Sequence, residues 1–333
     1  MKRINLLGLG FAAAVLLTAC SGAGGAGSTG GATDAPGQST APGPTKPITV
    51  HVAETAGVPS AFLNYGVDQG FFEKEGLDIV VDTGAGGAAA IPGIIGGTTD
   101  LADSNVVSVI LAKSKGLPLK IVAPGTFGAD IQDHAWSAVL VSKDSPIKSA
   151  ADLAGKTIAV NTLQNIGDVT IKSALEQQGI NIEGIKFVEV GFPNMLAALS
   201  NGNVDAVWEI EPFMTSGLSA GDRAVLYPYV QAHPGLMIGS FVATESYIAE
   251  HPDVVKAFQR GFEATVNSVM NDPDGFREAL PELAKIPEAA AQKMQLPTWK
   301  TQVDVSALEF VEEHMQKYGI STNKVDVSAM LSQ

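Results

Sequence analysis

Short apolar runs and longer stretches with helical spacing alternate along residues 48–102. The runs at 48–53 and 77–82 are rich in β-branched residues, and a helical stretch follows each of them before a short strand around 101–102. Both helical stretches end at glycines, which can adopt the left-handed conformation of a C-cap. The pattern therefore predicts the order β-α-β-α-β.

The same pattern recurs roughly 105 residues later. It predicts strands at 157–160, 185–190 and 206–208, with helices at 168–178 and 194–200 between them. The corresponding positions are Gln69-Gly70 with Gln178-Gly179, Gly76 with Gly184, and Gly97-x-x-Asp100 with Gly202-x-x-Asp205. Two similar α/β lobes are expected, each with apolar strands buried between helical layers.

Segments between and after the two copies give the chain two places to cross between lobes. Extended runs are indicated at 136–141 and 240–244, and we assign 47–141 and 241–333 to lobe I and 142–240 to lobe II. The tail is predicted to be helical. Pro252 suits a first helical turn. Ser306 and Glu309 have the spacing of a capping box, with Gly319 as the helix stop.

The first 46 residues have a different character. Lys2 and Arg3 precede an apolar run at 6–19, which is too short to cross a bilayer and is typical of a signal peptide. The run Leu17-Thr18-Ala19-Cys20 resembles the lipobox of bacterial lipoproteins, which implies a signal peptide at 1–19 and lipid attachment at Cys20. An ordinary secretory signal with an incidental cysteine, or a buried N-terminal helix, is the alternative.

Residues 20–46 are built almost wholly from Gly, Ala, Ser, Thr and Pro, and this composition predicts a flexible linker. The segment 22–27 fits a dinucleotide fingerprint, but it follows no predicted strand and precedes no helix. We therefore interpret it as linker.

Charge and cysteine content exclude several classes of function. Without Lys2 and Arg3, 19 basic residues stand against 35 acidic ones, so the formal charge changes from −14 to −16. This balance argues against nucleic acid and against an electrostatic membrane surface. Cys20 is the one cysteine. Once it is lipidated, no disulfide, thiol nucleophile or thiolate metal site remains.

The predicted ligand site lies at the carboxyl ends of the strands, where helix N-termini present free N–H groups. The loops there, at 54–60, 83–88, 103–106, 161–168 and 209–213, contain carboxylates but no Lys or Arg. Candidate ligand-binding residues are Ser60, Gly86, Gly87, Ser104, Asn105, Asn161, Thr162, Glu209 and Glu211. Other roles stay open: Asp103 and Asp168 as helix caps, Glu209 as a solvated side chain, and Trp208 as core.

The glycines at 84–87 follow a strand and fit G-x-G-x-x-A together with Ala89. A nucleotide site is disfavoured because Pro92 is expected to interrupt the helix and because the predicted compartment is extracytoplasmic. We interpret these glycines as a backbone cradle for a small anionic group.

The body from residue 48 resembles the solute-binding proteins of ABC importers, in the nitrate, sulfonate, taurine and thiamine-precursor (NMT1/THI5-like) group. The resemblance rests on GFFEKEGL at 70–77, SPI at 145–147, DLAGKTIAV at 152–160 and GNVDAVW at 202–208 with EPF at 211–213. It implies a type II periplasmic-binding-protein fold, in which two lobes joined by two crossings close over a small solute.

The resemblance also implies partners and a location. They are a small solute, an ABC transporter permease and, through the lipid, the extracytoplasmic face of the cell membrane. We expect a monomer without a cofactor or metal, and without enzymatic activity. The acidic loops favour an amino-sulfonate such as taurine, or a thiamine-precursor pyrimidine, over nitrate.

Two other classes of function remain. One is an exported enzyme of pyrimidine or thiamine-precursor chemistry on the same fold, although the related enzymes carry a cysteine-rich signature that is missing here. The five histidines form no i, i+4 pair, and there is no G-x-S-x-G motif. The other is a surface lipoprotein that uses the lobes for interaction with another protein.

Overall fold

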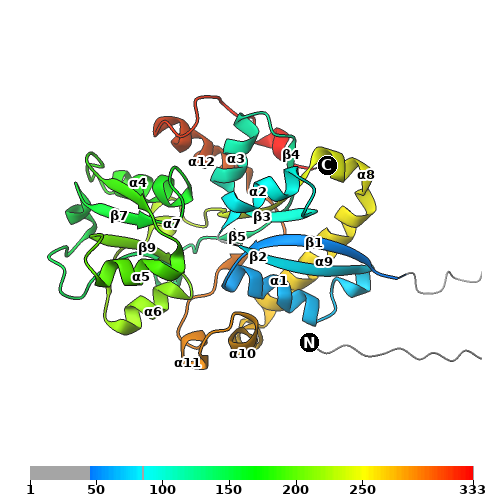
Figure 1. Cartoon of the computed structure of the whole chain (residues 1–333), viewed down its shortest axis with the longest axis horizontal. Coiled ribbons are helices and arrows are strands. Elements are labelled where there is room, and N and C mark those ends of the chain that lie inside the picture. The colour runs from blue at the N-terminus through cyan, green and yellow to red at the C-terminus, as the bar shows by residue number, and fades with distance from the viewer. Residues whose placement is uncertain (1–45, 85, 333) are drawn as a thin grey trace, which may run out of the picture. The chain divides into compact units, whose positions relative to one another are not determined.

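The computed structural model describes residues 46–84 and 86–332. The predicted signal peptide, Cys20 and nearly all of the predicted linker lie outside these residues. Within them, two five-stranded sheets are each covered by helices (Figure 1).

The first sheet has the strand order β2-β1-β3-β11-β4. Its strands are β1 (Ile48–Thr55), β2 (Leu77–Gly84), β3 (Leu101–Asn105), β4 (Leu119–Pro124) and β11 (Gly239–Thr244). Strand β1 runs parallel to β2 and β3, while β11 is antiparallel to β3 and β4. Its helices are α1 (Val58–Asp68), α2 (Gly87–Ile95), α3 (Val106–Ser114), α8 (Glu245–Glu250), α9 (Pro252–Asn271) and α10 (Pro273–Leu283).

The second sheet has the order β8-β7-β9-β6-β10. Its strands are β6 (Ser137–Val141), β7 (Thr157–Val160), β8 (Lys186–Glu189), β9 (Ala206–Ile210) and β10 (Arg223–Leu226). Strand β7 is parallel to β8 and β9, and β6 is antiparallel to β9 and β10. Its helices are α4 (Ile166–Gln177), α5 (Phe192–Ser200), α6 (Phe213–Ala220) and α7 (Pro228–Ala232).

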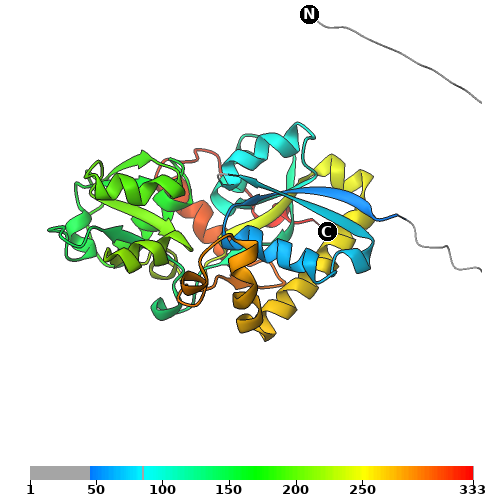
Figure 2. The same ribbon diagram turned by 60° about the horizontal axis from the view of Figure 1, so that its bottom comes forward.

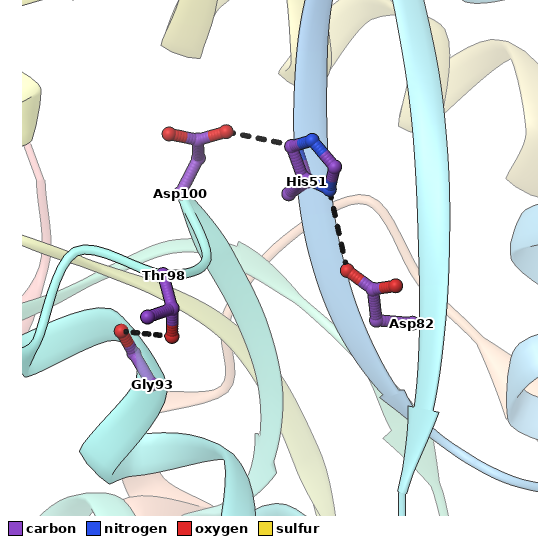
Figure 3. A network of polar contacts seen from close by, with 5 residues as sticks. All are labelled: His51, Asp82, Gly93, Thr98 and Asp100. Atoms are coloured by element: carbon purple, nitrogen blue, oxygen red, sulfur yellow. Dashed lines mark hydrogen bonds and ion pairs between the residues drawn. The ribbon is translucent and has the colours of Figure 1, made fainter.

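The two sheets have the same topology, which confirms the repeat predicted from the sequence. In both, a parallel trio is followed by an antiparallel strand that comes from a distant part of the chain. The repeated aspartate does the same task in each. Asp100 Oδ2 accepts a hydrogen bond from the backbone N–H of His51 at 2.8 Å (Figure 3), and Asp205 Oδ2 accepts one from Thr157 at 2.8 Å. Each aspartate thereby fixes the start of one strand against its parallel neighbour.

The chain crosses between the sheets twice, once between β5 (Thr126–Phe127) and β6 and once between α7 and β11. The sheet memberships correct one predicted boundary. Strand β6 was assigned to lobe I with residues 47–141, but it pairs with β9 and β10 in the second sheet. A crossing strand takes its place from its hydrogen-bond partners, which the sequence pattern does not identify. We use lobe I for the first sheet with its helices and lobe II for the second.

The C-terminal region returns to both lobes. After α11 (Glu288–Ala291), β12 (Thr298–Trp299) pairs with β5, and α12 (Val305–Lys317) packs against α3 of lobe I and α4 of lobe II. Figure 2 shows this helix between the two groups of elements. Lys317 Nζ lies 2.7 Å from Glu176 Oε2 in α4.

Two local predictions at helices were wrong. The predicted capping box at Ser306 is not the start of α12, because Asp304 caps the helix and accepts a hydrogen bond from the N–H of Ala307 at 3.1 Å. Pro92 does not interrupt α2, which continues to Ile95. By contrast, the helix predicted to begin at Pro252 is confirmed: α9 starts there, and its Val255, Phe258, Phe262 and Val266 are buried.

Among residues 46–84 and 86–332, no helix is long and apolar enough to cross a membrane. The same residues contain no group of three or more His, Cys, Asp or Glu side chains placed to hold a metal ion.

Candidate binding pocket between the two sheets

A pocket lies between the two sheets. Its lining residues are Thr55, Pro59, Gly86, Gly87, Asp103, Asn105, Thr126, Trp136, Asn161, Ile166, Phe192, Trp208, Ile210, Tyr229, Ile238 and Gly239. These residues come from the ends of β1, β3, β7 and β9, from the helices that follow, and from both crossings. This is where open α/β sheets bind ligands.

Lobe II and the first crossing supply an aromatic wall. The ring of Trp208 lies 5.4 Å from that of Phe192 and 5.9 Å from that of Tyr229, and Trp136 lies 5.0 Å from Tyr229. Both indole N–H groups are already used: Trp136 donates to the carbonyl of Phe127 and Trp208 to Ser137 Oγ, each at 2.8 Å. The two indoles therefore offer ring faces for stacking and not hydrogen-bond donors.

Lobe I supplies a carboxyl group. Asp103, within β3, lines the pocket and is 7% exposed, and its Oδ1 has no hydrogen-bond partner among the described residues. Burial raises the pKa of Asp103 to about 6. Glu54 of β1 lies in hydrogen-bonding contact with it, and burial together with the Asp103 charge raises the pKa of Glu54 well above its ordinary value.

Two glycines make room for the Asp103 carboxyl. A Cβ atom added at Gly125 would lie 2.7 Å from Asp103 Oδ1, and one at Gly239 would lie 2.9 Å from it. Real Cβ atoms do not approach oxygen so closely, so glycine at these two positions leaves the space that the carboxyl occupies.

Asn161, at the end of β7, faces the N-terminus of α2. A Cβ at Gly86 would lie 3.0 Å from Asn161 Nδ2, and Asn161 Oδ1 is a second buried acceptor without a partner in the described structure. Asn105 also lines the pocket, but its side chain caps α3 by accepting from the N–H of Ser108 at 3.0 Å. The pocket therefore contains two acceptor atoms without a donor, Asp103 Oδ1 and Asn161 Oδ1. No Lys or Arg is among its lining residues.

Four of the nine residues predicted to bind ligand line the pocket, namely Gly86, Gly87, Asn105 and Asn161. The other five, Ser60, Ser104, Thr162, Glu209 and Glu211, are not among its lining residues. Ser60 donates to the carbonyl of Gly57 within the first turn of α1. Ser104 is fully buried behind Gly87.

Glu209, within β9, and Glu211, just after it, have other surroundings. Glu211 accepts hydrogen bonds from the N–H and the hydroxyl of Thr215 and from the N–H of Gln295, so its oxygens are occupied within the protein. Glu209 is 0% exposed, which excludes the solvated side chain considered above. Neither of its oxygens has a partner among the described residues, and burial raises its pKa to about 9.

Asp103 and Asp168 do not serve as the helix caps considered above. Asp103 lies within β3, and the N-cap of α4 is Asn165. Asp168 Oδ2 instead accepts from the N–H of Gln164, and burial raises the pKa of this carboxyl to about 6. Trp208 is both core and pocket lining, since it is 1% exposed and forms part of the aromatic wall.

Contacts between the lobes lie near the pocket. Asn165 Nδ2 donates to Ser108 Oγ of α3 at 3.0 Å, and both residues are buried. Gln295, in the segment before β12, donates its N–H to Glu211 Oε1 at 3.1 Å. Direct hydrogen bonds therefore join lobe II to α3 of lobe I and to the segment before β12 near the pocket.

Sequence reasoning missed much of the aromatic wall. Trp136, Phe192 and Tyr229 were not among the candidates, because they lie in a crossing segment and at two helix starts that the sequence pattern treats as packing. A usable signal was the presence of Trp136 at the start of the first predicted crossing and of Tyr229 ahead of the second.

Comparisons with known proteins agree with this architecture. Residues 60–276 match the protein family described as NMT1/THI5 like. A formylaminopyrimidine-binding protein of Halalkalibacterium halodurans is 25% identical over 216 residues, covering 64% of this chain and 63% of that protein. A 4-amino-5-hydroxymethyl-2-methylpyrimidine phosphate synthase of Schizosaccharomyces pombe is 22% identical over 219 residues, covering 62% and 60%. The chain thus spans about three fifths of the length of these two relatives.

Among solved structures, the alkanesulfonate-binding protein SsuA from Xanthomonas axonopodis pv. citri, bound to MOPS, superposes with a TM-score of 0.70 at 16% identity. The superposition covers 86% of this chain and 99% of SsuA, which confirms the periplasmic-binding-protein fold. The family match covers more than half of the 333 residues, and this chain belongs to the NMT1/THI5-like family.

Proposed function

We propose that this protein is an extracytoplasmic solute-binding protein that captures a small organic solute and delivers it to the permease of an ABC importer. The observation that carries the proposal is the pocket between the sheets, in which an aromatic wall faces acceptor groups without donors. Family membership and the resemblance of the fold to a sulfonate-binding protein support it.

The pocket chemistry favours a flat ring with hydrogen-bond donors over a plain sulfonate or nitrate. Four aromatic side chains offer stacking faces, and Asp103 Oδ1 and Asn161 Oδ1 each require a donor. An anionic solute would meet Asp103 without any lining Lys or Arg to balance it. An aminopyrimidine of the kind named for one relative meets these requirements.

A thermal-shift screen tests the proposal. The panel contains aminopyrimidines, flavins, taurine, alkanesulfonates and nitrate, and a solute at 100 times its Kd should stabilise the protein by about 2.7 kcal/mol. Asn161→Ala should weaken the shift with little change in the ligand-free melting temperature. Asn203→Ala, an exposed asparagine outside the pocket, is the matched control. A panel that leaves the melting temperature unchanged would favour a surface-interaction role instead.

The alternative is an exported enzyme, and the relative named as a pyrimidine phosphate synthase is its support. Incubating the protein with the solute found in the screen, followed by mass spectrometry of that solute, separates the two. A binding protein returns the solute unchanged.

The proposed location depends on Cys20, which would carry the lipid and hold the protein at the cell membrane as a monomer on its extracytoplasmic face. Cys20→Ser should release the protein from membranes and remove the acyl mass. A variant that still partitions wholly with membranes and shows no loss of mass would refute the anchor.

A further inference from the structure

We propose that Glu54 and Asp103 act as a carboxyl pair that holds one proton between them, so that the pocket presents a single negative charge and selects a solute with a single positive charge. This inference rests on the proposed function, since it concerns the solute of the same pocket. It assigns a role to Glu54, which does not line that pocket.

The geometry places the two carboxyls together. Strands β1 and β3 are parallel and pair Val52 with Leu101 and Ala53 with Ala102, so the next step along this register brings Glu54 beside Asp103. Glu54 is 4% exposed and Asp103 is 7% exposed. Two ionised carboxylates have acceptors only, so a hydrogen bond between them requires that one carries a proton.

The neighbouring groups decide which carboxyl keeps the proton. Glu54 Oε1 accepts from the N–H of Thr55 at 2.7 Å, but burial and then the Asp103 charge outweigh this bond and favour the protonated form of Glu54. The hydrogen bond from Glu54 in turn favours the ionised form of Asp103, against burial. At neutral pH the pair is therefore a Glu54 acid that donates to an Asp103 carboxylate.

The charge of Asp103 has no counter-ion within the pocket. The elements packed around it contribute Gly87 of α2, Gly239 of β11, Thr126 of β5 and Trp208 of β9, none of which is charged. Tyr229 of α7 is the other titratable lining group, and burial raises its pKa, so it stays neutral. A buried carboxylate with one free oxygen and no basic neighbour is balanced best by a cationic donor on the solute.

Glu54 borders a second cavity, which is lined by residues of β1, β2 and α2. Glu54, Asp82, Gly93 and Thr99 line it, and Asp82 Oδ2 lies 3.4 Å from Nδ1 of the half-exposed His51 (Figure 3). Glu54 can therefore exchange its proton with solvent through this cavity while a solute occupies the pocket.

Two probes of the same shape test the charge preference. They are 4-amino-5-aminomethyl-2-methylpyrimidine, which carries an ammonium group, and its neutral 5-hydroxymethyl analogue. Calorimetry at pH 7 should show at least roughly tenfold tighter binding of the ammonium probe. Its affinity should fall by about tenfold per pH unit below pH 6, because protonation of Asp103 removes the charge, and should level off above pH 7. Equal affinities with a flat pH profile would overturn the proposal.

Variants separate the roles of the two carboxyls. Asp103→Asn should abolish both the preference and the pH dependence. Glu54→Ala should move the midpoint of the pH profile upward, because the hydrogen bond that favours ionised Asp103 is lost. Glu54→Gln, which keeps a donor, should restore the midpoint. Asp253→Asn, an exposed aspartate in α9, is the matched charge control. A midpoint that is the same in Glu54→Ala and wild type would overturn the pairing.

The ligand-free protein gives a readout that needs no solute. Carboxyl ¹³C NMR should show Asp103 titrating near pH 6 while Glu54 remains protonated at pH 7. Ionisation of both groups below pH 5 would overturn the shared proton. If neither pyrimidine binds, the proposed solute class fails. The charge preference is then judged with benzamidinium against neutral benzamide, and equal behaviour of these two would overturn it.

Discussion

The two lobes have the same strand order, but their equivalent positions carry opposite chemistry. Counting from the first paired residues of β1 with β3 and of β7 with β9, Glu54 and Asp103 in lobe I correspond to Val160 and Trp208 in lobe II. Lobe I thus places a carboxyl pair where lobe II places an apolar pair under Gly167. Duplicated topology does not require duplicated chemistry. One lobe supplies charge, and the other supplies a ring face.

The largest effect is expected from removing that ring. Trp208→Ala should lower the free energy of unfolding by about 3–5 kcal/mol, because the indole is 1% exposed and packs against Phe192 and Tyr229. Chemical denaturation measures this loss. Asp103→Leu changes the equivalent position in lobe I. If it lowers the free energy of unfolding as much as Trp208→Ala does, then Asp103 serves stability and the contrast between a charged and a packed position is wrong.

The next step along each strand gives a second contrast, between Ser104 and Glu209. The pKa of Glu209 is raised by burial to about 9, so the stability it contributes is fully present below about pH 4.5 and is lost as the pH rises toward 9. Between pH 5 and 9, the ionisation of Glu209 should lower the free energy of unfolding by at most ~1.4 kcal/mol per pH unit. Glu209→Gln should remove this fall, and melting temperatures measured across that pH range should show a flatter slope. Ser104→Ala should leave the slope unchanged. Parallel slopes in wild type and Glu209→Gln would show that this carboxyl does not titrate there.

A smaller effect is expected where the lobes touch. Asn165→Ala removes both the cap of α4 and the bond to Ser108 in α3, and should cost about 1–2 kcal/mol. Asp304→Ala removes the cap of α12 and is the control for a lost cap. X-ray scattering should show that the wild type becomes more compact when solute binds. This compaction should be smaller in Asn165→Ala and unchanged in Asp304→Ala. An unchanged radius of gyration in the wild type would refute lobe closure.

The smallest effect should appear where the lobes are alike. Asp100→Ala and Asp205→Ala each remove a 2.8 Å hydrogen bond at the start of a strand, and each should cost about 0.5–1.5 kcal/mol. Hydrogen exchange should locate the first loss in lobe I and the second in lobe II. If the two variants lose markedly different amounts of stability, the two lobes share a strand order but the equivalent hydrogen bonds do not contribute equally.

Local signals were enough to predict the repeat. The glycines at 97 and 202 adopt φ of 71° and 70°, and the aspartates three residues later form equivalent bonds, so spacing alone identified both copies. The pocket was harder to predict, because Glu54 and Asp103 meet through strand register and Trp136 meets Tyr229 through the chain crossings. Neither relation has a local sequence pattern. Glu209 and Glu211 are candidates because of their positions in the sequence, yet alternation along β9 turns Glu209 away from the face that carries Trp208 and Ile210.

The late position of β11 determines the order in which the two sheets can be completed. All five strands of lobe II lie within residues 137–226, whereas β11 joins β3 to β4 in lobe I only once residue 239 is in place. Because the proposed export delivers the chain N-terminus first, lobe II can complete its sheet while lobe I still has open strand edges. The emerging chain should therefore need protection from aggregation in its N-terminal part more than in lobe II.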